Sequence, residues 1–244
     1  MSKKKNDNDT KKVLYLSRRK KNAYVKNIQT LICDKCYNMI PLAVNFKLFY
    51  PVSKVKNSGL YLSFDVICPI CNEMTYMYAV DPAIAGAVAI FNKMGYKTEY
   101  SCQGHIEVLY KPSKEKYSYD DSQPIVPDYN NPYIAIRGDK KMTKELESLL
   151  KKIHWDHFSA ANDDGFYEPA DSIVGKKNFA IYLSNDFIEK RIGELLETRH
   201  SKKDVTYIAN TINAFFIANC SKLETTLLDY TRIEYVCNSD IGRL

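Results

Sequence analysis

The sequence lacks the features that mark several large protein classes. Its longest apolar run, residues 83–91, is far shorter than the roughly 20 residues that a membrane-spanning helix needs. The basic N-terminal stretch has no apolar segment behind it, so we expect no secretory signal. There is no glycine-rich phosphate loop, no serine-nucleophile elbow and no dinucleotide fingerprint. The sequence therefore offers no motif for the enzyme classes that depend on them, and no membrane partner is expected.

The excess of positive over negative charge is confined to the first 27 residues. Residues 1–27 contain ten lysines and arginines against two aspartates, a balance of +8, whereas the whole chain carries only +6 and the remainder therefore −2. A basic arm on a near-neutral body is typical of proteins that hold phosphate backbones. The candidate nucleic-acid-binding residues are Lys12, Arg18, Arg19, Lys20 and Lys21. The alternative is a solvated tail that only keeps the protein in solution.

Cysteine is present in an odd number, seven, and four of the seven form two pairs with the same spacing. The pairs are Cys33-Asp-Lys-Cys36 and Cys68-Pro-Ile-Cys71. Two thiolates on one tight turn face the same point, and two such turns supply the four sulfur ligands that tetrahedral Zn²⁺ prefers. The pattern predicts a closed, structural zinc site. Metal-type spacing, rather than a disulfide framework, favours a reducing, cytoplasmic setting.

Two alternatives to zinc stay open. The 31 residues between the pairs exceed the roughly 15–20 of a compact ribbon, and the second pair also resembles a thiol-redox motif. A redox motif leaves the first pair without a role, and unliganded cysteines are the third possibility. Asn72, directly after the second pair, supports the metal turn, since asparagine tolerates the left-handed backbone that such a turn requires.

The remaining patterns predict an α+β fold with an N-terminal four-cysteine zinc ribbon, a central mixed α/β body and C-terminal helices. The expected segments are a basic disordered arm (1–27), the zinc ribbon (28–80), an α/β core (81–185) and a helical segment packed on that core (186–244). Within the core, residues 111–131 lack periodicity and are predicted to be a loop insertion. Apolar spacing predicts one helix over 186–199, then one long or two abutting helices over 204–235.

The turn Cys102-Gln-Gly-His105 brings a thiol and an imidazole together between two predicted strands. Its glycine indicates either a positive φ or the close approach of a ligand to the backbone. Three functional interpretations are open: metal ligands, a nucleophile with its base, or the wall of a small-molecule pocket. The alternative is that a buried cysteine and a half-exposed histidine simply pack the turn.

The block around this turn resembles a known family. The core signature of the tRNA methyltransferases of wybutosine synthesis has an aspartate before a helix, an asparagine at the end of that helix, a Tyr-x-Thr strand and a Ser-Cys-x-Gly turn. This sequence resembles that signature at Asp81, Asn92, Tyr96, Thr98, Ser101, Cys102 and Gly104. The resemblance covers residues 81–137. It implies a related α/β scaffold, S-adenosylmethionine as cofactor and methylation of an RNA base.

Under that resemblance, the ligand-pocket candidates are Asp81, Asn92, Ser101 and Gly104. His105 stands where the family has arginine, and it lacks the permanently charged fork of that side chain. Tyr100 and Gln103 also depart from the family's two serines. The same string behind a zinc-ribbon-like start also resembles uncharacterised proteins of phages and low-GC Gram-positive bacteria.

Two functional hypotheses follow. The first is an intracellular zinc-binding protein, phage-associated if the second resemblance holds, that engages nucleic acid or a nucleoprotein complex through its basic arm and through tyrosines that stack on bases. The alternative is an S-adenosylmethionine-dependent RNA-base methyltransferase-like enzyme that uses the Ser101–His105 turn, with Cys102 and His105 as catalytic candidates. The sequence indicates no oligomeric state.

Overall fold

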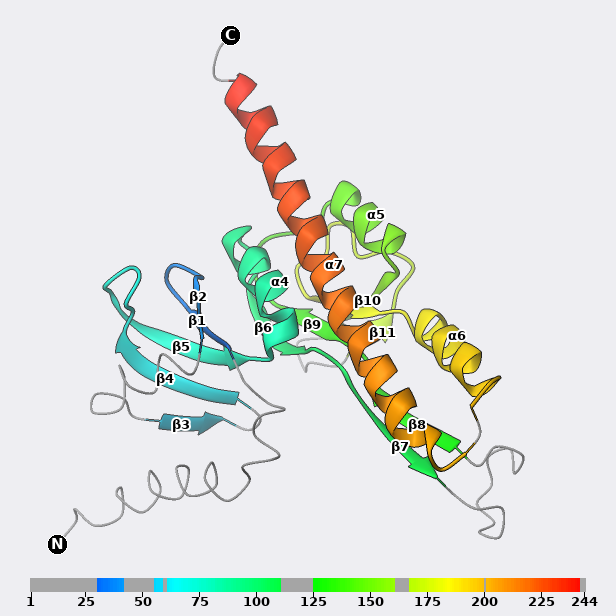
Figure 1. The fold of residues 1–244 in the computed structure, drawn as a ribbon. Helices are drawn as coiled ribbons and strands as arrows, with labels where there is room; N and C mark the ends of the chain where they lie inside the picture. Colours follow the sequence, from blue (N-terminus) through cyan, green and yellow to red (C-terminus); the bar gives the residue numbers. More distant parts are fainter. Residues whose placement is uncertain are drawn as a thin grey trace, which may run out of the picture. The chain divides into compact units, whose positions relative to one another are not determined.

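The computed structural model describes residues 30–41, 55–58, 61–110, 125–160, 167–199 and 201–241. It has the predicted α+β fold and divides into two compact units, residues 1–85 and 86–244, with the boundary inside helix α4 (Pro82–Lys93) (Figure 1). The basic arm lies outside the described residues. Its candidate residues Lys12, Arg18, Arg19, Lys20 and Lys21 therefore stay predictions.

The first unit contains a five-stranded antiparallel sheet in the order β2-β1-β5-β4-β3. The strands are β1 (Thr30–Cys33), β2 (Met39–Pro41), β3 (Val55–Ser58), β4 (Tyr61–Ile67) and β5 (Met74–Val80). One cysteine pair lies on the turn between β1 and β2, and the other on the turn between β4 and β5, as the zinc-ribbon pattern predicts. Buried Cys33 and Cys68 form part of a small core with Leu31, Ile40, Met77 and Ala79.

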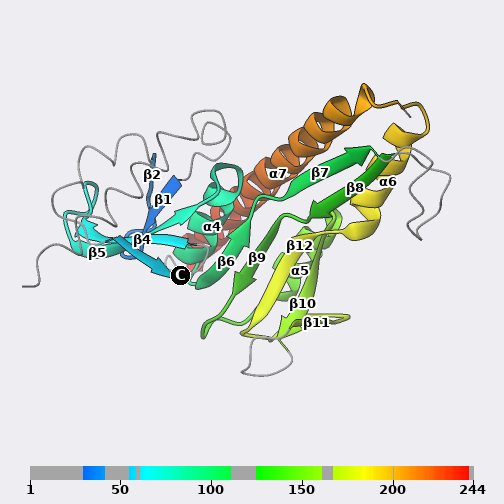
Figure 2. The same ribbon diagram turned by 90° about the horizontal axis from the view of Figure 1, so that it is seen from below.

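The second unit contains a five-stranded antiparallel sheet in the order β11-β10-β12-β9-β6 and a two-stranded hairpin. The sheet strands are β6 (Thr98–Cys102), β9 (Tyr133–Ile136), β10 (Trp155–Ala160), β11 (Tyr167–Pro169) and β12 (Phe179–Leu183); the hairpin strands are β7 (His105–Tyr110) and β8 (Ile125–Asn130). Figure 2 shows that this hairpin extends beyond the ends of β6 and β9. The short turn from β6 to β7 is the Cys102–His105 turn.

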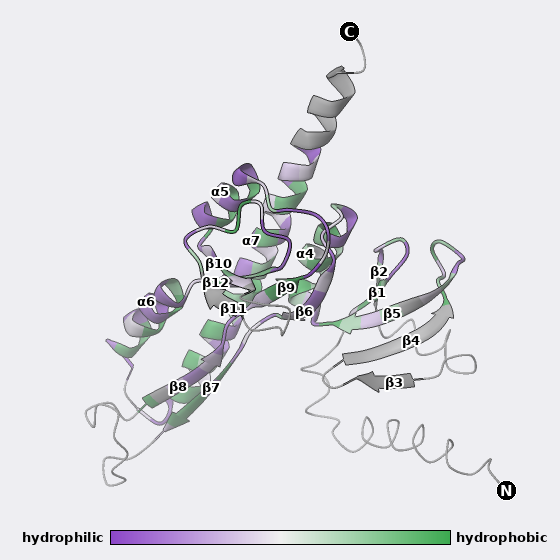
Figure 3. Ribbon diagram, turned by 180° about the vertical axis from the view of Figure 1, so that it is seen from behind, coloured by the Kyte–Doolittle hydropathy of each residue, from purple (hydrophilic) through white to green (hydrophobic). Residues whose placement is uncertain are grey.

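Helices cover one face of this sheet. Figure 2 shows the strands in front of α4, α5 (Lys144–Lys152) and α7 (Asp204–Ile241), while α6 (Asn185–Leu196) lies beside the hairpin. Both α5 and α6 carry hydrophilic residues on one side and hydrophobic residues on the other (Figure 3). Ile134, Ile136, Phe179 and Ile181 are fully buried on the helix-covered face. In the described part of the chain, no helix combines the length and apolar character needed to cross a bilayer.

Two predicted elements differ from the structure, and one open alternative is decided by it. Residues 125–130, placed in a loop by their prolines and polar residues, form strand β8, because pairing with the whole of β7 offsets their weak strand propensity. Residues 111–124 of that predicted insertion lie outside the described residues. Helix α6 ends at Leu196 rather than at residue 199. The two options for the C-terminus resolve into one continuous helix, α7, of 38 residues.

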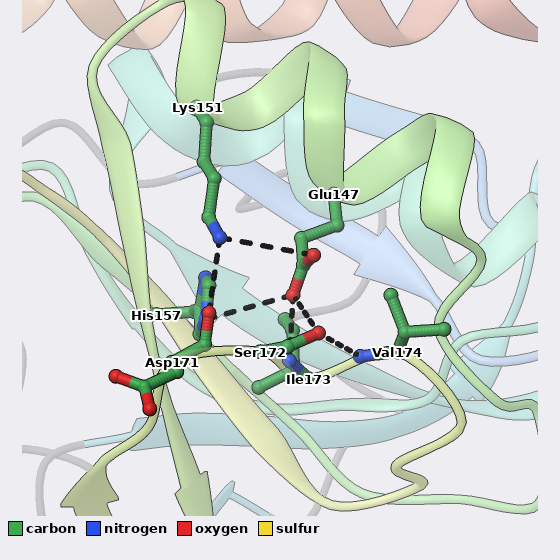
Figure 4. Close-up of polar contacts among 7 residues, drawn as sticks. All are labelled: Glu147, Lys151, His157, Asp171, Ser172, Ile173 and Val174. Atoms are coloured by element: carbon green, nitrogen blue, oxygen red, sulfur yellow. Dashed lines mark hydrogen bonds and ion pairs between the residues drawn. The ribbon is translucent and has the colours of Figure 1, made fainter.

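A buried carboxylate attaches α5 to the segment that precedes β12 (Figure 4). Glu147 Oε1 accepts hydrogen bonds from the Ile173 N–H at 2.6 Å and from the Ser172 hydroxyl at 2.8 Å. Lys151 lies one helical turn further on, with Nζ 3.8 Å from Glu147 Oε2. His157 of β10 is also buried, and its Nε2 lies 3.6 Å from Glu147 Oε1, beyond hydrogen-bond length. The Glu147 carboxylate thus links α5 to the segment before β12 by hydrogen bonds and lies beside His157 of β10.

Glu147→Ala is expected to destabilise the second unit by about 2–3 kcal/mol, because it leaves the buried Ile173 N–H without its acceptor. Guanidinium unfolding followed by circular dichroism measures the change. Glu145→Ala, two residues away on the same helix but exposed, is the control and should change stability by less than about 0.5 kcal/mol. Equal losses of unfolding free energy in the two variants would contradict the role given to Glu147.

Acid is expected to weaken the same cluster. Burial lowers the pKa of His157 below its ordinary 6.5 despite the attraction of Glu147. Burial alone would raise the pKa of Glu147, but the hydrogen bonds from Ile173 and Ser172 outweigh it and hold that pKa below 4.5. Both groups bind protons more readily in the unfolded chain. Stability should therefore fall as the pH drops below about 6.5 and again below about 4.5. Unfolding midpoints between pH 7 and 4 test this, and His157→Gln should remove the upper step.

Candidate metal centre and aromatic groove

The two cysteine turns share one backbone geometry. The N–H of Tyr37 donates to the carbonyl of Cys33 at 2.9 Å, and the N–H of Asn72 donates to the carbonyl of Cys68 at 2.8 Å. Tyr37 and Asn72 follow the second cysteine of their pairs, and both have positive φ, 52° and 57°. The left-handed conformation predicted at Asn72 is confirmed. At Tyr37 it occurs in a bulky residue that rarely adopts it, so the turn imposes it.

Backbone N–H groups point at the first sulfur of each pair. The N–H groups of Lys35 and Cys36 lie 3.4 and 3.5 Å from Cys33 Sγ, and that of Ile70 lies 3.4 Å from Cys68 Sγ. Hydrogen bonds of this kind stabilise a thiolate more than a thiol, since the acceptor carries the charge. The turns therefore prepare both sulfurs to act as anionic ligands.

The four sulfurs converge on one point. All four lie within 4.8 Å of one another, and the Cys33–Cys71 and Cys36–Cys68 sulfur pairs are each 3.9 Å apart. Tetrahedral coordination with metal–sulfur bonds of 2.3 Å requires sulfurs about 3.8 Å apart. Spacing, ligand type and number all fit, so the four cysteines can hold one metal ion. Four protein ligands leave no coordination position open for water or substrate.

A cation among the four sulfurs would favour their ionised form. Burial raises the pKa of the Cys33 and Cys68 thiols. At Cys36 burial acts in the same direction, but hydrogen bonds from Asn38 and neighbouring thiols lower the pKa to about 7. Four thiolates this close would repel one another strongly without a positive charge between them. A divalent cation would remove that repulsion and convert its binding energy into folding energy.

The second unit has a groove of about 500 Å³ on the sheet face opposite the helices. Its lining is Tyr100, Asn130, Asn131, Tyr133, Ala135, Phe158, Ala180, Tyr182 and Asn185. Residues paired across antiparallel strands share a face. Tyr100, Ala135, Ala180 and Phe158 form one such row across four strands, and Cys102, Tyr133, Tyr182 and Asp156 form the next.

The two rows form a slot with aromatic walls and a floor of two alanines. Ala135 and Ala180 pair directly with each other, and their small side chains leave room between Tyr100 and Phe158. The rings of Phe158 and Tyr182 are stacked, with centroids 4.3 Å apart and planes 11° apart. Burial and the charges of Asp156 and Asp186 raise the pKa of Tyr182, so its hydroxyl stays protonated at neutral pH. The lining residues are uncharged, which suits a planar, neutral ring better than a phosphate.

The predicted Cys102–His105 turn lies at one end of this groove. His105 pairs with Asn130, a lining residue, and Cys102 pairs with Tyr133, another. Gly104 has φ +80°, and a Cβ there would lie 2.6 Å from Pro132 Cδ and 2.9 Å from the ring of Phe216. The glycine is thus explained by its backbone conformation and by close packing against α7.

The other pocket candidates lie apart from the groove. Asn92 is buried and connects α4 to β6 by hydrogen bonds to Val88 and to both the hydroxyl and the N–H of Thr98. Ser101 pairs with buried Ile134, on the alternate face of β6 from Tyr100 and Cys102. Asp81 precedes α4, where its carbonyl accepts from the N–H groups of Ile84 and Ala85.

Sequence reasoning missed the groove itself. Its signal is a small or aromatic residue at every second position, as in Tyr133-x-Ala135, Ala180-x-Tyr182 and Tyr100-x-Cys102. Alternation of this kind predicts that a strand has two different faces but not which strands are neighbours.

Comparisons with known proteins add no relative: no protein-family model, curated protein or solved structure matches the chain. The resemblances of residues 81–137, to the tRNA methyltransferases and to the phage and Gram-positive proteins, therefore stay predictions. So does the S-adenosylmethionine-dependent alternative.

Proposed function

We propose that this is an intracellular, zinc-stabilised protein that binds single-stranded nucleic acid, free or within a nucleoprotein complex. The bases lie in the aromatic groove of the second unit, and the basic arm contacts phosphates. The observation that carries the proposal is the set of aromatic side chains on the sheet face opposite the described helices, which includes Tyr100, Tyr133, Phe158 and Tyr182.

Bases suit this groove for physical reasons. A stacked base contributes about 1–3 kcal/mol without requiring a particular sequence, because every base has a π-face. The two floor alanines leave depth for a ring, and the amides of Asn130, Asn131 and Asn185 can donate to or accept from base edges. A duplex keeps its bases stacked and hidden, so a stacking surface selects single strands.

Zinc is the metal proposed for the four-cysteine centre. Four thiolates in tetrahedral spacing suit Zn²⁺ or an iron centre, and a closed four-thiolate site with a structural role suits zinc. Elemental analysis of the purified protein should give one zinc per chain and no iron. Substoichiometric zinc that stays low after refolding with added Zn²⁺ would contradict the assignment.

Nucleic-acid binding is expected to depend on both the salt concentration and the basic arm, residues 1–27. Fluorescence anisotropy with a labelled single-stranded oligonucleotide should show affinity that falls steeply between 50 and 200 mM salt, roughly in proportion to the number of phosphates contacted. Deletion of residues 1–27 should remove most of that salt dependence and weaken binding, since the rest of the chain carries no excess positive charge. A labelled duplex of the same length is the control and should bind more weakly. Salt-independent binding, or none, would defeat the proposal.

A further inference from the structure

Three chemically complementary side chains meet at the end of the groove. Cys102 Sγ lies 3.6 Å from His105 Nδ1, and His105 Nε2 lies 2.9 Å from the side-chain amide of Asn130. The Gly104 N–H points at Cys102 Sγ from 3.4 Å. A thiol beside an imidazole that is oriented by a third polar group is the general arrangement of an activated cysteine nucleophile. We propose that Cys102, His105 and Asn130 form such a site and attack activated acyl groups.

The backbone holds the three groups in place. His105 and Asn130 are direct partners in the β7–β8 hairpin, which keeps imidazole and amide side by side. Cys102 ends β6, and the turn through Gly104, with φ +80° and packed against Pro132 and Phe216, returns the chain so that the two side chains face each other. Gly104 is therefore a positioning residue. His105 is exposed and Cys102 half-buried, so a substrate can reach the sulfur.

The Asn130 amide selects the tautomer of His105. As the structure places it, Nδ2 faces Nε2 and donates to it, so the imidazole proton lies on Nδ1 beside the sulfur. Rotation of the amide by 180° presents the carbonyl oxygen to Nε2–H instead. The lone pair of Nδ1 then faces the thiol and can accept its proton, and the amide oxygen stabilises the resulting imidazolium.

The neighbouring groove indicates the substrate class. Asn130 contributes to both the triad and the groove lining, and Tyr133, opposite Cys102, lines the groove as well. A substrate with a planar ring in the slot would place an attached acyl group near the sulfur. The class proposed is an ester or thioester that carries a planar ring next to its acyl group. This inference uses the same groove as the proposed nucleic-acid function but does not require that function.

The reaction balances as a hydrolysis. His105 Nδ1 takes the Cys102 proton, sulfur bonds to the acyl carbon, and the carbon–oxygen bond of the ester breaks as the leaving group departs with the electron pair. A basic leaving group takes the proton from His105; a weakly basic one such as p-nitrophenolate leaves as the anion, and His105 then releases its proton to solvent. Water then attacks the thioester while His105 accepts its proton; the carbon–sulfur bond breaks, and the thiol regains its proton. Ester and water yield acid and alcohol, and no oxidant or further reactant is required.

The test uses the full, metal-loaded chain and p-nitrophenyl acetate, which combines an acyl group with a planar ring. We expect release of p-nitrophenolate and, after an acid quench, an acetyl group on the peptide that contains Cys102. Cys102→Ser should lose the thioester. His105→Ala should slow acetylation about 100-fold, the scale of a general base, and Asn130→Ala should slow it less. His154→Asn alters an exposed histidine away from the groove and should leave the rate unchanged.

Folding is checked by melting temperature, because all of these residues are at least partly exposed and should be replaceable without unfolding. Acetylation on another residue, a wild-type rate in His105→Ala, or no acetylation of the wild-type protein would each overturn the proposal. A folded His105→Ala variant that still binds single-stranded oligonucleotide but no longer acetylates would separate this site from the nucleic-acid function.

Discussion

Removal of the metal is expected to unfold the first unit and leave the second folded. Buried Cys33 and Cys68 belong to a small core, so loss of the ion leaves repelling thiolates where apolar contacts should be. Structural zinc contributes on the order of 10–16 kcal/mol of apparent binding energy at neutral pH, more than the stability of a small domain. Hydrogen exchange read by mass spectrometry should then show lost protection in β1 and β5 and unchanged protection in β9 and β12.

Single cysteine substitutions test whether the first unit depends on the metal, without the need to remove the metal with a chelator. Cys36→Ser or Cys71→Ser replaces one part-exposed ligand with a hydroxyl that binds zinc poorly, and metal content should fall below one per chain. Cys102→Ser is the matched control, since it removes a half-buried thiol outside the centre and should keep the metal. Full protection of β1 in protein that contains no metal would show that the four cysteines do not stabilise the first unit.

Loss of the groove aromatics is expected to cost the largest share of nucleic-acid affinity. Tyr133→Ala and Tyr182→Ala should each weaken binding of a single-stranded oligonucleotide about tenfold, from about 1.4 kcal/mol of lost stacking per base. The two residues pair directly, so the double variant should lose less than the sum. The dissociation constant is measured by anisotropy at fixed salt, and the salt slope should stay unchanged because no cation is removed.

Matched variants separate stacking from other effects. Tyr133→Phe keeps the ring and loses only the hydroxyl, and it should bind nearly as the wild type does. Tyr207→Ala removes an exposed tyrosine from α7, outside the groove, and should have no effect. If both alanine variants bind with wild-type affinity while deletion of residues 1–27 abolishes binding, the arm alone would account for the interaction.

The four-cysteine cluster could be predicted from the sequence because its determinants are local. Each Cys-x-x-Cys turn orients two sulfurs within four residues, and Asn72 reports the left-handed bend that follows. Only the tertiary structure could show that the two Cys-x-x-Cys turns lie next to each other. A shared metal ion is one of few arrangements that stabilise four thiolates at such short distances. Helix α6 was likewise predictable, since a 3.6-residue apolar period is complete within one segment.

The groove and the triad, by contrast, were decided by strand pairing. The alternation in Tyr133-x-Ala135 and Ala180-x-Tyr182 shows that each strand has two faces, but register alone places the alanines opposite each other. Asn130, 25 residues beyond His105 and on a strand predicted as loop, joins it only because β7 and β8 pair. Ligands within one turn are determined by local sequence, whereas a site assembled across strands depends on long-range pairing, which local sequence specifies weakly.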